Sequence, residues 1–141
     1  MLELIKQELK NQIGDEKLID NLFLSFSKIS EDYIAQNPVG LLQNTGLFIE
    51  SVLRIAEHFV LGNHTPLSGI FKIDACIQKL DKSSGFDGLR IHTARLCRAV
   101  YDFRTRKKSV HLKSIDPQAI DADLVFNISN WIIIEILKEG N

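Results

Sequence analysis

Apolar residues recur every three or four positions along almost the whole chain, which is the period of amphipathic α-helices. The pattern predicts helices over about residues 2–13, 15–37, 39–61, 69–80 and 86–104, and a final helix that starts at 116–117. Gly14 and Gly62 are placed to end the first and third helices, and Asp15 to cap the second. We therefore expect an all-α bundle of about five or six helices, forming one domain over residues 1–141.

Two of the expected helices are long, and their arrangement sets the architecture. Because short loops between long helices favour antiparallel neighbours, the helices over 39–61 and 86–104 are expected to run antiparallel at the centre. In the final helix, Asp116 is the expected cap and Pro117 the first helical residue. Its core face is predicted to carry Ile120, Leu124, Val125, Ile128, Ile132 and Ile136.

The composition is that of an ordinary globular domain. Of the 141 residues, 45% are hydrophobic and 25% charged, which argues against a disordered chain. The start lacks the apolar centre of a signal peptide, and no apolar run approaches the length of a membrane span. Cys76 and Cys97 are far apart and stand among apolar residues, so both are expected to be reduced, buried thiols. These features predict a cytoplasmic protein without membrane contact.

The charge is unevenly distributed along the chain. The formal net charge is only −1, but residues 90–113 carry eight basic side chains against Asp102 alone. Positive charge gathered on one helix and the loop after it is typical of a site for a polyanion. A solvated helix face followed by a basic loop explains the same composition equally well.

Several kinds of site are absent from the sequence. It contains no glycine-rich phosphate loop, no H-E-x-x-H and no nucleophile elbow. Glu57, His58 and His64 form a loose set of possible metal ligands that is more simply a surface cluster at a helix end. We expect neither a metal nor another cofactor.

One segment carries recognisable chemistry: residues 101–111 read YDFRTRKKSVH. Arg104 is a permanent cation with directed donors, and His111 titrates near neutrality. Cleavage of RNA through its own 2′-hydroxyl needs these two groups, an imidazole to move a proton and a cation to hold charge on phosphate oxygens. By spacing alone the pair is a weak signal, since Arg104 could simply interact with the carboxyl end of its helix.

The surrounding sequence strengthens this interpretation. From about Gly46 to Lys138 the chain resembles the HEPN superfamily, in particular the helical domains of abortive-infection proteins. That family's hallmark is an Arg followed, after four to six residues, by a His at the end of a long helix. Arg104 and Arg106 both fit this spacing to His111. Thr105 stands where the family often has Asn, and the sequence leaves open which arginine is the essential one.

The resemblance implies a metal-independent endoribonuclease that acts as a toxin or antiviral effector. Its catalytic residues would be Arg104 and His111. The remaining candidates are Asp102, Thr105 and Arg106 in support, Lys107, Lys108, Lys113 and Arg98 on RNA phosphates, and Glu50 as a weaker candidate. Lys113 stands where one branch of the family carries a tyrosine that its antitoxin modifies. Asp102 is equally able to pair with Arg98, and Glu50 to form a surface pair with Arg54.

RNA is the expected partner, with an antitoxin or other defence protein also possible. One Arg and one His supply a single acid–base group, so we expect a two-fold homodimer that brings two Arg104/His111 loops together. The alternative function is a non-catalytic helical module for dimerisation or for binding nucleotide or RNA. A DNA-binding helical protein is a weaker reading, because no helix-turn-helix spacing is evident.

Overall fold

The computed structural model describes residues 1–107 and 116–140, and within these ranges the protein is all-helical. The helices are α1 (Leu2–Ile13), α2 (Glu16–Ile34), α3 (Pro38–Leu61), α4 (Ile73–Lys82), η1 (Gly88–Thr93), α5 (Ala94–Lys107) and α6 (Ala119–Glu139). The predicted all-α bundle is therefore confirmed. None of the described helices is long and apolar enough to cross a membrane.

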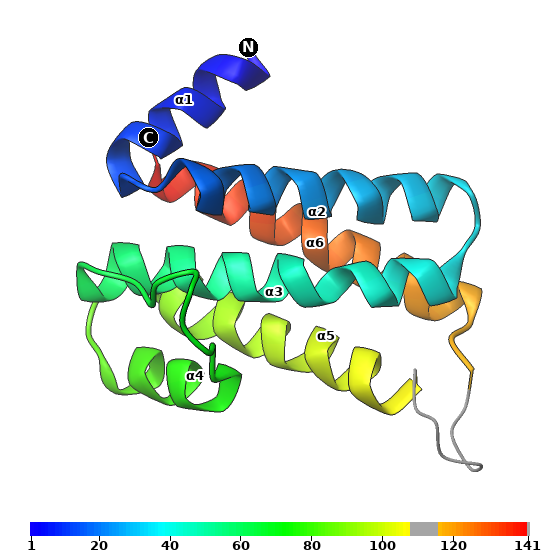
Figure 1. Ribbon diagram of the computed structural model, residues 1–141. Coiled ribbons are helices and arrows are strands. Elements are labelled where there is room, and N and C mark those ends of the chain that lie inside the picture. The colour runs from blue at the N-terminus through cyan, green and yellow to red at the C-terminus, as the bar shows by residue number, and fades with distance from the viewer. Residues whose placement is uncertain (108–115, 141) are drawn as a thin grey trace.

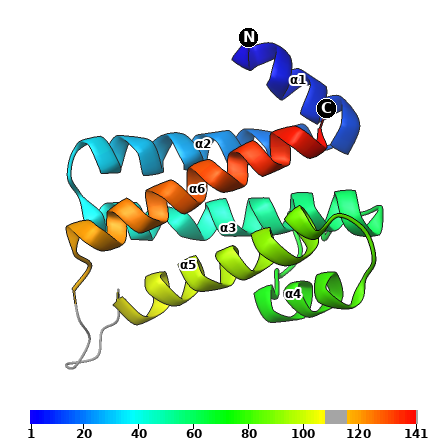
Figure 2. The same ribbon diagram turned by 180° about the vertical axis from the view of Figure 1, so that it is seen from behind.

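Helix α3 is the centre of the bundle. It packs against α2, α4, α5 and α6, and its buried stripe includes Phe48, Val52 and Ile55. α5 runs antiparallel to α3 on one side, and α2 and α6 cover the other (Figures 1 and 2). The predicted antiparallel pair of long helices is present, although α5 lies at the side of the bundle.

Local sequence accounts for the helix ends. Gly14 and Gly62 adopt left-handed conformations at the C-caps of α1 and α3, which a residue without Cβ does at little cost. The Asp15 carboxylate accepts a hydrogen bond from the backbone N–H of Leu18 at 3.1 Å, as predicted for the cap of α2. Gln36 is the non-glycine exception, with φ of 55° in the turn between α2 and α3.

Several boundaries differ from the sequence prediction: the helix predicted over 69–80 is α4 at Ile73–Lys82, and α2 ends at Ile34 rather than near 37. The predicted helix over 86–104 is a π-helical turn, η1, followed by α5. The end of the Glu135 side chain of α6 packs against Gly88 at the start of this turn. The final helix is capped by Gln118 rather than Asp116, because the Asp121 carboxylate accepts from the Gln118 N–H at 2.8 Å and completes a capping box.

The core follows the predicted stripes with one instructive exception. Both cysteines are free and buried, as expected. Burial raises the pKa of the Cys76 thiol to about 12 and that of Cys97 further. On α6, however, Ile120 and Leu124 were predicted in the core and are instead 74% and 45% exposed. Ala122, Val125, Ser129, Ile132 and Ile136 form the buried face, on the other side of the helix.

Candidate functional site

The carboxyl end of α5 lies at one end of the bundle. The turn from α2 to α3 and the start of α6 lie at this same end (Figures 1 and 2). Arg104, near the carboxyl end of α5, therefore lies at the same end of the bundle as three other helix termini. α3 and α6, which hold this end in place, both carry very apolar buried stripes.

Arg104 lies across the face of α3 at Gly46. A Cβ built at Gly46 would stand 3.0 Å from Nε, 3.1 Å from Cζ and 3.2 Å from Nη2 of Arg104. The guanidinium therefore rests directly on the α3 backbone, in space that any other residue at position 46 would fill. In the sequence, Gly46 marks only the start of the stretch that resembles the HEPN superfamily, and no pattern there predicts this contact.

The contact leaves an Arg104 donor unsatisfied. Its Nε atom is buried and has no hydrogen-bond partner within the described structure. Buried polar atoms of native proteins are almost always paired, but Arg90 Nε and Thr93 Oγ1 are also buried without a partner among the described residues, so the unpaired atom alone does not mark a ligand site. An Arg held in this way offers directed donors to a phosphate or carboxylate.

Other predicted supporting residues are close to Arg104 along the chain. The Thr105 hydroxyl donates to the carbonyl oxygens of Tyr101 at 3.0 Å and Asp102 at 3.3 Å, so it interacts with its own helix. Asp102 is half-buried two residues before Arg104, on a different side of α5. Arg98, the alternative partner of Asp102, pairs instead with Asp74 of α4.

Glu50 is half-buried on α3, one helical turn after Gly46. Residues four apart share a helix face, so Glu50 lies on the stripe of α3 that Gly46 presents to α5. The expected surface pair with Arg54 is wrong. Arg54 is only 5% exposed and donates from Nε to the Thr65 carbonyl oxygen at 3.1 Å.

The other predicted site residues are not placed. Lys108, His111 and Lys113 lie outside the described residues, as do the side chains of Arg106 and Lys107. The pairing of Arg104 with His111, and the choice between Arg104 and Arg106, therefore stay predictions.

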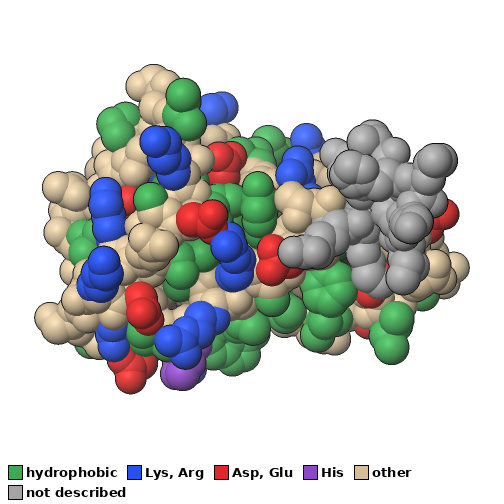
Figure 3. Space-filling view, turned by 90° about the horizontal axis from the view of Figure 1, so that it is seen from below, with side chains coloured by type: hydrophobic (Ala, Val, Ile, Leu, Met, Phe, Trp, Pro, Cys, Tyr) green, Lys and Arg blue, Asp and Glu red, His purple; other side chains and the backbone are tan. Residues whose placement is uncertain are grey.

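The basic side chains of residues 90–98 are offset in the folded structure by acidic side chains that lie beside them. Arg90 pairs with Asp87 at 2.9 Å and Arg95 with Asp81 at 3.3 Å, and Arg98 pairs with Asp74. Figure 3 shows the α4–α5 face, where basic and acidic side chains are interleaved. The first half of the predicted basic patch is a set of surface ion pairs, and its charge is largely neutralised. Arg98, a predicted RNA contact, is one of these paired residues.

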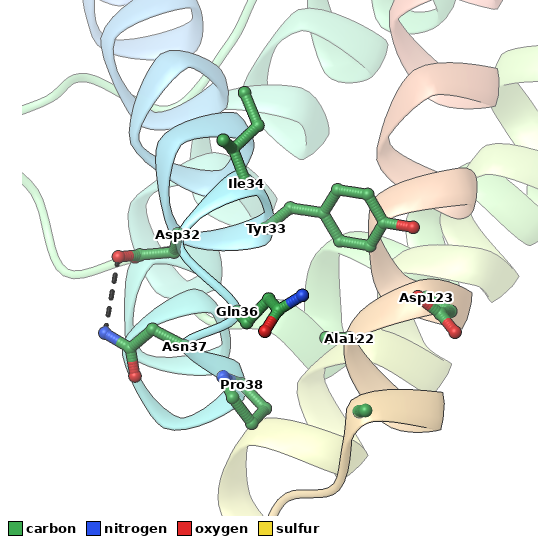
Figure 4. A pocket seen from close by; sticks show the side chains of 9 residues that line it. Asp32, Tyr33, Ile34, Gln36, Asn37, Pro38, Ala122 and Asp123 are labelled. Carbon is green, nitrogen blue, oxygen red and sulfur yellow. Dashed lines mark hydrogen bonds between the residues drawn. The ribbon is translucent and has the colours of Figure 1, made fainter.

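A pocket of about 630 Å³ opens between the end of α2 and the start of α6. Figure 4 shows the Tyr33 ring reaching toward α6 beside Asp123, with Asp32 bonded to Asn37. A hydrogen bond with Asp123 raises the pKa of Tyr33 above its usual value. Two carboxylates at this pocket disfavour phosphate, which separates it in chemistry from the Arg104 site.

Glu57, His58 and His64, the loose set of possible metal ligands, lie at the other end of α3 and form hydrogen bonds there. His64 contacts the Asp15 carboxylate at 3.0 Å and His58 at 3.3 Å, while Glu57 accepts from the Thr65 N–H at 3.0 Å. Among the residues that the structure describes, no group of three such side chains is arranged to hold a metal ion.

Comparisons with protein-family models, with curated proteins and with solved structures find no match for this chain. The function is therefore argued from the Arg104 site itself and from the sequence motif around it.

Proposed function

We propose that the protein is a metal-independent endoribonuclease of HEPN type, with Arg104 and His111 as its catalytic residues. The observation that carries the proposal is the half-buried Arg104 guanidinium, which is seated on α3 at Gly46 near the carboxyl end of α5. Such a group suits the charged oxygens of a scissile phosphate. The predicted His111 follows seven residues later in the sequence.

In the proposed reaction, His111 removes the proton from the ribose 2′-hydroxyl. The 2′-oxygen attacks phosphorus, the bond from phosphorus to the 5′-oxygen breaks, and the leaving oxygen takes up a proton. The products are a 2′,3′-cyclic phosphate and a 5′-hydroxyl. Arg104 stabilises the negative charge that builds on the non-bridging oxygens, a contribution of on the order of 3 kcal/mol for one well-placed donor. Because the substrate supplies its own nucleophile, the reaction needs no metal.

The departing 5′-oxygen requires a second acid–base group. Glu50 lies one turn beyond Gly46 on the same face of α3, so it is a candidate within the same chain. A partner copy was the source expected from the sequence. The Glu50→Gln variant distinguishes these two sources of the second acid–base group, because it lowers the cleavage rate only if Glu50 of α3 is that group.

Binding of the RNA strand falls mainly to the later cations of the motif. With Arg98 committed to Asp74, the proposed phosphate contacts are Lys107, Lys108 and Lys113, as point charges without base preference. Affinity should therefore fall steeply with salt. A role as a toxin or antiviral effector in the cytoplasm belongs to the same proposal, and it predicts that expression of the active chain slows cell growth while the Arg104→Ala chain does not.

The test is cleavage of a single-stranded RNA in EDTA by wild type and four variants. Arg104→Ala and His111→Ala should each lower the rate by about a hundredfold or more. Arg95→Ala and His92→Ala, matched controls of the same residue types earlier in the same stretch, should cleave like wild type. RNA binding without cleavage by the wild-type protein would instead favour the non-catalytic binding module.

A further inference from the structure

The outer face of α6 is apolar, although nothing in the described structure covers it. Ile120, Leu124, Trp131 and Ile134 are 74%, 45%, 40% and 55% exposed. The opposite face of the same helix is buried against α2 and α3. In Figure 2, α6 crosses the near side of the bundle with its outer face toward the viewer. A helix that is apolar on both sides is normally covered on both sides.

The exposed positions follow a regular spacing. Ile120, Leu124, Asn127, Trp131 and Ile134 are separated alternately by four and three residues, and Lys138 continues the series. This is the seam that one helix presents to another in a coiled coil, and it contains a polar residue at its midpoint. A random scatter of exposed apolar residues, as most proteins have, shows no such period.

We propose that this seam binds the same seam of a second copy of the chain, with the two α6 helices antiparallel. The inference does not rest on the proposed function, but it bears on it, because in this dimer the partner copy cannot supply the second acid–base group. A two-fold pair is centred on Asn127, which faces the partner's Asn127. Ile120 then meets the partner's Ile134, and Leu124 meets the partner's Trp131, so a large side chain lies against a smaller one. An isologous contact of this kind closes after two copies.

Charge favours the antiparallel direction. The exposed acid Asp116 precedes the helix, and the exposed cation Lys138, which pairs with Glu135 of its own helix at 3.4 Å, lies near its end. Antiparallel pairing places each Lys138 near the partner's Asp116, whereas parallel pairing places like charges together. The dipoles of two antiparallel helices also oppose each other favourably.

The contact has a consequence for the Arg104 site. α6 has 21 residues and is about 32 Å long, and its first turn lies at the Arg104 end of the bundle. Antiparallel pairing therefore sets the two Arg104 sites at opposite ends of the dimer. The expected homodimer is kept, but its contact face differs from the loop-to-loop arrangement expected from the sequence.

Sedimentation of the full chain at micromolar concentration tests the surface. Wild type should sediment as a dimer, and Leu124→Glu should sediment as a folded monomer, because the site is already half exposed. Leu24→Glu is the matched control: Leu24 is 50% exposed on α2, away from the seam, and its variant should remain dimeric. A monomeric wild type, a dimeric Leu124→Glu or a monomeric Leu24→Glu would each overturn the proposal.

Cysteine cross-linking tests the direction. The native thiols are buried, so introduced cysteines report on the surface. A mixture of Ile120→Cys and Ile134→Cys chains should form a disulfide between the two variants, while Ile120→Cys alone should not cross-link to itself. Self-cross-linking of Ile120→Cys would establish a parallel pair and overturn the antiparallel assignment.

Discussion

Replacing Gly46 by Ala should change stability and cleavage in opposite directions. Gly46 stands inside the 24-residue helix α3, where Ala is preferred over Gly by about 0.5–1 kcal/mol. Against this gain, the new Cβ would lie 3.0–3.2 Å from three guanidinium atoms of Arg104. The end of a flexible, half-buried side chain yields by a few tenths of an ångström at small cost. The net change is therefore a rise in melting temperature of about 2–4 °C.

Cleavage should fall in the same variant. The displaced guanidinium loses its seat on the α3 backbone, and a misplaced phosphate clamp lowers the rate by on the order of tenfold or more. In an Arg104→Ala background the Gly46→Ala change should lower cleavage no further, since the group that it displaces is gone.

The assay is thermal unfolding by circular dichroism together with initial cleavage rates on one RNA substrate. Ser27→Ala is the control, because Ser27 is exposed on α2 and also gains helix propensity. That variant should be stabilised without loss of cleavage. If Gly46→Ala cleaves RNA as fast as wild type, the contact with Gly46 does not position the Arg104 guanidinium. A lowered melting temperature would refute the reasoning that the Arg104 side chain moves aside at small cost.

Three further predictions concern the fold. Gln36→Gly should raise stability by up to about 1 kcal/mol in urea unfolding, because it relieves a left-handed non-glycine residue; an unchanged midpoint would contradict this. Asp15→Ala should cost about 1 kcal/mol through loss of the α2 cap. Although burial raises the pKa of Asp15, hydrogen bonds from His64 and the Leu18 N–H bring it below its usual 3.8, so its contribution is present above that pH and is lost as the pH falls through the lowered value. A wild-type protein with no excess acid sensitivity over Asp15→Asn would contradict the assignment. Native Cys76 and Cys97 should resist a thiol reagent that labels them once unfolded, and rapid native labelling of either would contradict their burial.

The periodicity of apolar residues is enough to predict where the helices lie, but not which face of each helix is buried. The stripe of α2 identifies its buried face because that helix has a clear polar side, whereas α3 is buried on nearly all sides over residues 51–57. α6 has apolar residues all round, so the pattern gave no way to choose between the Ile120–Leu124 side and the Ala122–Val125 side. The choice is made in three dimensions, by which side fits against α2 and α3.

The candidate site was predictable in part for a similar reason. The motif is enough to single out Arg104 as a candidate site residue. The Asp87–Arg90 ion pair is also predictable from local sequence, because the two residues are three apart on one helical stretch. The partners of Arg98 and of Arg104 come from other helices, Asp74 on α4 and Gly46 on α3. Such contacts depend on helix packing, which local spacing does not encode.

The most direct test of the central claim is the end chemistry of the RNA products in EDTA. The substrate is a single-stranded RNA, compared with the same oligonucleotide carrying a 2′-deoxy nucleotide on the 5′ side of each cut. The wild-type protein should leave 2′,3′-cyclic phosphate and 5′-hydroxyl ends, spare the deoxy positions, and lose this activity in Arg104→Ala/His111→Ala. Cleavage that stops in EDTA, proceeds at the deoxy positions or survives the double substitution would contradict the account.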